Sequence, residues 1–139
     1  MMNTTELYNL SPVAWVMLMG ALIALMPLAW VSWSHRGKDA VTKSHALAIL
    51  TLFLTFDLVL FGAFTRLTDS GLGCPDWPGC YGSASPVGAA CSIYDAQKAQ
   101  PTGPVTLGKA WIEMVHRYLA TGVGVLILTL ASMTWWLRR

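Results

Sequence analysis

Three long apolar stretches constrain this chain more than any other feature of its sequence. Residues 13–31 carry no charged side chain, residues 46–65 carry only Asp57, and residues 118–137 carry none. Each stretch is about as long as the roughly 20 residues that a helix needs to cross the hydrocarbon core of a bilayer. Because lipid cannot satisfy backbone donors and acceptors, each stretch is expected to be a membrane-spanning helix.

The composition supports the same class of protein. Only 12% of the residues are charged, about half the share that is typical of a soluble domain. The 7 Trp and 7 Met residues exclude a disordered chain, and a net charge of +2 is too small for a nucleic-acid-binding surface. We therefore predict an all-α integral membrane protein with three transmembrane helices that contacts membrane lipid and no nucleic acid.

The basic residues favour one orientation in the membrane. Three of the nine Lys and Arg residues lie in the short segment 32–45, and two more are the last two residues, 138–139. Both positions flank helix ends closely, where the positive-inside rule is strongest, so both are expected in the cytoplasm. The amino-terminal residues 1–12 and the segment 66–106 then lie outside the cytoplasm, as in a multi-pass protein of the bacterial inner membrane.

The segment 66–106 begins with a turn-rich stretch that contains two cysteines. Cys74 and Cys80 are separated by Pro and Gly residues that can fold the chain back on itself. In an oxidising compartment the two thiols can pair as a disulfide that closes a small loop. Free or redox-cycling thiols and a zinc site are the alternatives, although the segment has no His and only Cys91 as a further thiol. The pair either staples the loop or exchanges thiols.

A Glu-x-x-His-Arg motif precedes the third apolar stretch. Unbroken helix formers predict one helix over 107–137, which places Glu113 and His116 one turn apart on one face, with Arg117 four residues after Glu113. Ionisable residues at this depth usually face a bundle interior or a cavity. The functional interpretation of His116 is metal ligation, with haem as the metal group; the alternative is an imidazole satisfied by Glu113 or by a backbone carbonyl.

Two charged residues, one within the second apolar stretch and one directly after it, have open roles. Asp57 lies near mid-membrane, where a structural hydrogen bond, protonation or a cation on another helix would satisfy it. Arg66 ends the same helix at the outer interface. It either holds an anionic group such as a haem propionate or marks the end of the helix.

In combination, these motifs resemble the haem A synthase family of cytochrome oxidase assembly proteins. The chain has Thr-Arg-Leu-Thr-Asp-Ser-Gly at 65–71, then the paired Cys74 and Cys80, then the Glu-x-x-His-Arg helix entry at 113–117. The resemblance covers about residues 46–137. It implies a membrane enzyme that oxidises a methyl group of haem O to the formyl group of haem A, built of eight core helices in two four-helix halves that each hold a haem between paired His ligands.

The resemblance also implies roles for individual residues. His116 would be an axial ligand of the haem iron, and Glu113 would be the nearby carboxylate needed for activity. Apart from the resemblance, Arg66 and Arg117 are further candidate haem-binding residues. Haem O would be the substrate and haem B a second bound group, and the expected partners are cytochrome oxidase assembly proteins such as haem O synthase.

The sequence departs from the family pattern in one respect. It reaches only two of the core helices, so the partner of His116 is absent; His35 and His45 cannot replace it because they are expected at the cytoplasmic side, about a membrane thickness away. We therefore expect the amino-terminal part of a longer protein, completed by its remaining helices or by another subunit, and inactive as this 139-residue chain alone. The alternative function is a non-catalytic membrane haem-binding or assembly factor.

Overall fold

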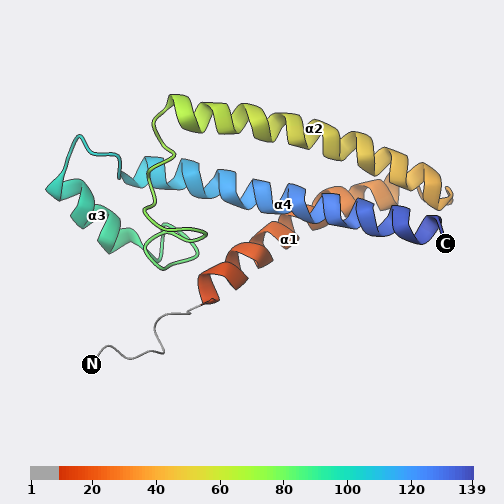
Figure 1. Ribbon diagram of the computed structural model, residues 1–139, viewed down its shortest axis with the longest axis horizontal. Helices are drawn as coiled ribbons and strands as arrows, with labels where there is room; N and C mark the ends of the chain where they lie inside the picture. Colours follow the sequence, from red (N-terminus) through yellow and green to blue (C-terminus); the bar gives the residue numbers. More distant parts are fainter. Residues whose placement is uncertain (1–9) are drawn as a thin grey trace.

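The computed structural model describes residues 10–139 as four helices joined by loops (Figure 1). No strand forms among these residues, so the predicted all-α class is confirmed. The expected segment 1–12 lies mostly outside the described residues. The helices are α1 (Ser11–Ser34), α2 (Ala40–Leu67), α3 (Ala90–Ala99) and α4 (Leu107–Leu137).

Helices α1, α2 and α4 are each long and apolar enough to cross a membrane, as predicted. All three extend beyond the apolar stretches of the sequence, because helical hydrogen bonding continues into the polar flanks while hydropathy marks only the apolar part. Helix α2 begins at Ala40, inside the segment 32–45 that we expected as a loop. At this start the Thr42 hydroxyl donates to the Asp39 carboxylate at 2.5 Å, which lowers the pKa of that carboxyl.

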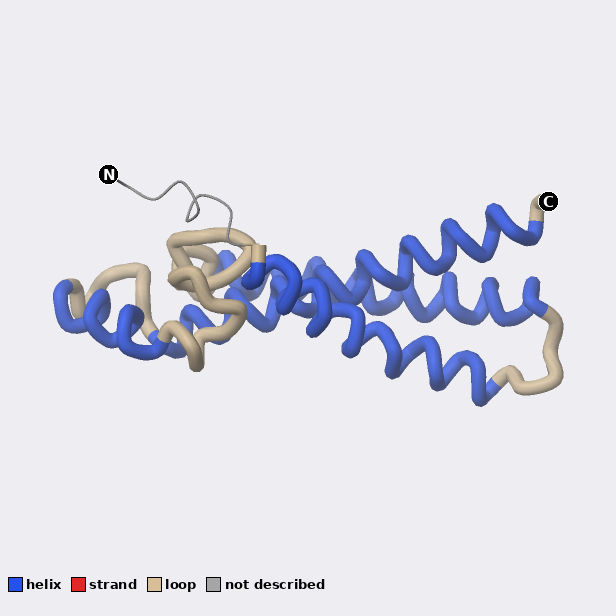
Figure 2. Tube along the Cα trace, turned by 90° about the horizontal axis from the view of Figure 1, so that it is seen from below, coloured by secondary structure: helices blue, strands red, loops and turns tan. Residues whose placement is uncertain are grey.

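Helix α4 is the central helix of the fold. It packs against both α1 and α2, and Figure 1 shows α2 running alongside α4 while α1 crosses it. The loop after α2 and the short helix α3 gather where α4 begins, and the connection between α1 and α2 lies at the other end, near the end of α4 (Figure 2). The two segments expected in the cytoplasm therefore share one end of the structure.

Two buried apolar clusters stabilise this arrangement. At the loop end, the loop and α3 pack on the first turns of α4 around Ile93, Ala110 and Met114. Along the spanning part, Ala24 and Leu126 pack where α1 meets α4. The loop cluster holds the segment after α2 firmly on the helix that carries the Glu-x-x-His-Arg motif.

The close crossing of α1 and α4 predicts a sensitivity to Gly20. A Cβ added at Gly20 would lie 2.4 Å from Cγ2 of Thr121 and 3.0 Å from the nitrogen of Gly122. We expect Gly20→Ala to force the helices apart and to cost about 1–3 kcal/mol, as overpacking of a tight contact does. Thermal unfolding in detergent will show this as a lower midpoint temperature.

The matched control is Gly124→Ala, because Gly124 lies on α4 with no heavy atom within 4 Å of the added Cβ. This variant should unfold at the wild-type temperature or slightly above it, since Ala favours a helix over Gly. Equal midpoints for the two variants would contradict the close crossing at Gly20.

Candidate functional site

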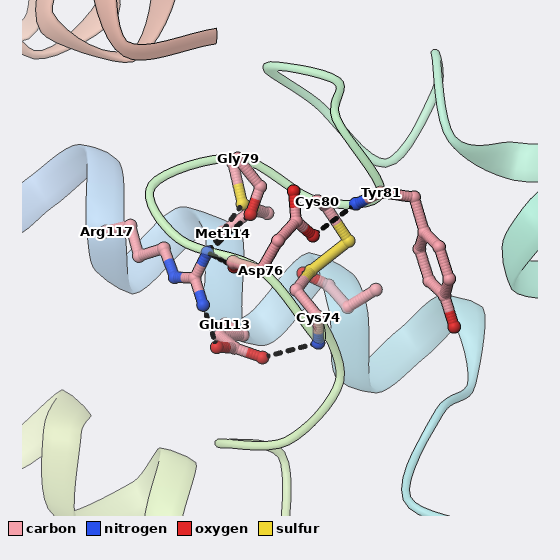
Figure 3. A network of polar contacts seen from close by, with 9 residues as sticks. Cys74, Asp76, Gly79, Cys80, Tyr81, Glu113, Met114 and Arg117 are labelled. Atoms are coloured by element: carbon pink, nitrogen blue, oxygen red, sulfur yellow. Dashed lines mark hydrogen bonds and ion pairs between the residues drawn. A yellow bond between two sulfur atoms is a disulfide. The ribbon is translucent and has the colours of Figure 1, made fainter. Parts of the chain in front are cut away.

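The candidate site lies where a disulfide-closed loop sits on the first turns of α4 (Figure 3). Cys74 and Cys80 form a disulfide with their Cα atoms 4.9 Å apart, which is the pairing expected from their spacing. Both half-cystines are buried, whereas Cys91 on α3 is free and exposed. Over residues 10–139 no three His, Cys, Asp or Glu side chains gather to hold a metal ion.

Glu113 joins this loop to α4. This residue is only 7% exposed; its Oε2 accepts the backbone N–H of Cys74 at 2.8 Å, and its Oε1 forms an ion pair with Arg117. The pairing of Glu113 with Arg117 agrees with the expectation from their spacing of four residues. Because both oxygens have partners, the buried charge is compensated.

Arg117 binds the turn between the two cysteines. Besides its ion pair, its guanidinium donates to the carbonyl of Asp76 at 2.7 Å and to the carbonyl of Gly79. The Asp76 carboxylate in turn accepts the backbone N–H groups of Tyr81 at 2.5 Å and Gly82 at 2.8 Å. The planar guanidinium therefore connects one helix turn to several points of the loop, a task that its fixed array of donors suits.

Further contacts bring the loop backbone close to α4. A Cβ added at Gly73 would lie 2.7 Å from the backbone nitrogen of Ala110, so only Gly fits at this approach. The Tyr118 hydroxyl donates to the carbonyl of Ala84, and Lys109 forms a more exposed ion pair with Asp69 at 3.3 Å. The loop is thus held to α4 along its first turns.

His116 faces α2 rather than the loop. Its half-buried ring lies against Phe61, with ring centroids 6.0 Å apart. A Cβ added at Gly62 would come within 3.0 Å of Nε2, so this glycine leaves room for the imidazole. Throughout the described part of the chain no group forms a hydrogen bond with the imidazole nitrogens, and Glu113 pairs with Arg117 instead.

The donor set at this position fits a haem. A neutral imidazole without a hydrogen-bond partner is a good ligand for iron. Arg66 lies in the last turn of α2, four residues beyond Gly62 and so on the same side of that helix; its exposed guanidinium has no partner among residues 10–139. His35 and His45 belong to the opposite end of the structure, where α1 ends and α2 begins, so neither can pair with His116 (Figure 1).

Sequence reasoning missed several residues of this site. Asp76 organises the disulfide loop, and an Asp in a Pro- and Gly-rich turn is a signal that could have identified it. Phe61 and Gly62 form the surface against which His116 lies. No local signal predicts this contact, because it joins two helices that are far apart in the sequence.

Fold and site together define a helical membrane protein with a disulfide loop seated on a histidine-bearing helix. Residues 45–139 match the family model described as cytochrome oxidase assembly protein. The chain belongs to this family. The match includes α2 from residue 45 onward, the loop, α3 and α4, and it leaves α1 outside.

Several similar proteins carry the name heme A synthase. The chain is 48% identical over 79 residues to the protein of Shewanella oneidensis, which covers 57% of this chain and 24% of that protein. It is 35% identical over 121 residues to the protein of Rhizobium etli strain CIAT 652, a match that covers 79% of this chain and 32% of that protein. To the protein of Lysinibacillus sphaericus it is 31% identical over 91 residues, a match that covers 66% of this chain and 23% of that protein. The chain therefore spans about a quarter to a third of these relatives, and no solved structure matches it significantly.

The contacts of Arg117 predict how a substitution there affects the loop. Arg117→Lys keeps the charge but loses the fork of donors that reaches Glu113 and the two loop carbonyls. We expect backbone amides of residues 74–82 to exchange hydrogen about tenfold faster, which corresponds to a local loss of about 1.4 kcal/mol. Hydrogen exchange followed by mass spectrometry measures this directly.

The control for this experiment is Lys109→Met. It breaks the ion pair with Asp69, and exposed ion pairs contribute no more than about 1 kcal/mol. Exchange in residues 74–82 should then stay within a few-fold of wild type. If Arg117→Lys changed exchange no more than Lys109→Met, the guanidinium would not be holding the loop.

Proposed function

We propose that this protein is a haem A synthase of the bacterial inner membrane. It oxidises a methyl group of haem O to the formyl group of haem A and so serves cytochrome oxidase assembly. Membership of the family and the names of the similar proteins support the proposal. The observation that carries it is the unpartnered His116 imidazole one turn from the buried Glu113 carboxylate. Helices α2 and α4 fit as two of the eight core helices of a bundle of two four-helix halves, and α1 would be an addition to that core.

Two residues would hold the haem at this end of the bundle. His116 would supply one axial ligand to the iron, and Arg66 would pair with a propionate at the end of α2. The haem itself supplies the iron and, as haem O, the methyl group that reacts; haem B is the second group we expect to be bound. A second His from the remaining helices or from another subunit would complete the ligand pair.

Glu113 is the side chain that we propose as catalytic. Converting a methyl to a formyl group with water as the oxygen source releases four protons and four electrons; an external electron acceptor must take the electrons, and a nearby carboxylate can accept the protons one at a time. The ion pair with Arg117 and the hydrogen bond from Cys74 hold this carboxylate in one orientation. Arg117 has its donors on Glu113 and the loop, so we propose that it positions Glu113 and that Arg66 is the arginine that contacts haem.

A non-catalytic haem-binding or assembly factor is the second candidate function. The specific observation in its favour is that both oxygens of Glu113 are engaged in structural contacts. A third possibility, thiol exchange, is disfavoured because Cys74 is 5% exposed and Cys80 is 0% exposed, which leaves little access for an attacking thiolate.

Replacing Glu113 distinguishes an enzyme from a carrier. In the protein as the cell makes it, Glu113→Gln keeps the shape of the side chain and removes the charge and the proton acceptor. We expect haem to be retained while conversion of haem O falls at least about a hundredfold, as loss of acid–base catalysis typically does. Chromatography of the extracted haems measures both quantities, with Lys109→Met as the control. Unchanged conversion would favour the carrier.

The free thiol on α3 tests the proposed orientation. A membrane-impermeant maleimide applied to spheroplasts should label Cys91, which is exposed and expected outside the cytoplasm. Without reductant it should label no second thiol within residues 66–106, because Cys74 and Cys80 are paired. The variant Ser34→Cys places a thiol at the last residue of α1, which is expected on the cytoplasmic side, so it should react only after the membrane is opened. The reverse labelling pattern would overturn the orientation.

A further inference from the structure

An apolar groove lies between α1, α2 and α4. It has a volume of about 660 Å³, which falls in the range of about 300–1,000 Å³ that small-molecule sites occupy. Asp57 is its only charged lining residue. The apolar lining includes Ile23 and Pro27 of α1, Leu54 and Leu58 of α2, and Val123 and Leu126 of α4.

One end of this groove lies beside His116. Phe61 lines the groove, and the same ring packs against the imidazole. From Phe61 the lining continues along α2 as far as Leu50, a helix length of about 16 Å at 1.5 Å per residue. The groove therefore begins at the proposed haem ligand and runs into the part of the helices that spans the membrane.

We propose that this groove holds the isoprenoid tail of haem O. The inference rests on the proposed function and specifies how the same site recognises its substrate. Haem O differs from haem B in carrying, at the edge of the macrocycle, a hydroxyl-bearing chain of three isoprene units. A flexible apolar chain of that kind matches the length and lining of the groove, and its burial would be favourable in proportion to the apolar area covered.

Asp57 distinguishes this occupant from a lipid acyl chain. It lies one turn from Phe61 on α2, lines the groove, and has no hydrogen bond or ion pair with any residue among 10–139. A polar group at membrane depth needs a partner. The hydroxyl of the haem O tail sits next to the macrocycle and can donate to this carboxyl group, whereas an acyl chain offers no donor at that depth.

The proposal gives α1 a role in substrate binding. This helix supplies Ile23, Ala24, Met26, Pro27 and Trp30 to the groove, although the family match begins only at residue 45. Without α1, one side of the groove would be open to lipid. The tail site would thus be built from the family's helices together with a helix that the family model does not include.

The experiment compares binding of haem O and haem B to the full protein by titration of the haem absorption band. Leu54→Trp places a larger side chain in the groove, and Leu60→Trp is the control, because Leu60 lies on the same helix but is exposed and does not line the groove. With the second haem site filled by haem B beforehand, we expect wild type and Leu60→Trp to bind haem O at least about tenfold more tightly than they bind further haem B. Leu54→Trp should lose that preference while its affinity for haem B stays unchanged.

A second pair of variants tests the hydroxyl contact. Asp57→Leu removes the acceptor and should weaken haem O binding about tenfold, with haem B unaffected. Asp57→Asn keeps an acceptor oxygen and should stay within about threefold of wild type. Unchanged affinity for haem B shows in each case that the variant is folded. If Leu54→Trp loses affinity for both haems, the haem O affinity of Asp57→Leu becomes the test of the tail site.

The outcomes separate this inference from the proposed function. Equal affinity of the wild type for the two haems, or an unchanged preference for haem O in Leu54→Trp and Asp57→Leu, would overturn the tail site. If haem A still formed in that case, the proposed function would stand. If the wild type bound neither haem, the proposed function and the tail site would both fall.

Discussion

The buried ion pair between Glu113 and Arg117 is the contact on which the arrangement of the site depends. Two charges removed from water are tolerated only when their remaining hydrogen-bonding groups are satisfied. Here the disulfide loop supplies those groups: the Cys74 N–H for the carboxylate, and the carbonyls of Asp76 and Gly79 for the guanidinium. The loop and the helix therefore stabilise each other, and neither charge could keep its position without the loop.

This pairing determines what the neighbouring groups can do. Because Glu113 is engaged with Arg117, it does not bind His116, and the imidazole lies one turn further along α4 against Phe61 and Gly62 of α2. A histidine without a partner at this position suits metal ligation more than a structural role. From the same ring, an apolar groove leads into the spanning part of the helices. The anchored loop, the proposed haem ligand and the apolar groove thus follow one another along α4.

The sequence predicted the local part of this structure well. Apolar stretches identified the three spanning helices, an unbroken run of helix formers predicted the start of α4 near Leu107, and a spacing of four residues predicted the pairing of Glu113 with Arg117. The loop contacts of Arg117 and the position of His116 against α2 could not be predicted, because they join segments about forty residues or more apart. Helix α3 was also not predicted: it is short, and its apolar contacts form only when the loop packs on α4.

The account is tested most directly by the haems that this protein makes. Cells that lack their own haem A synthase but supply haem O should express the protein as it occurs naturally, either unchanged or as His116→Ala, and their extracted haems should be separated by chromatography with mass detection. The account predicts haem A in cells with the unchanged protein and its loss, with reduced haem binding, in His116→Ala. No haem A with the unchanged protein, or equal amounts with both, would contradict it.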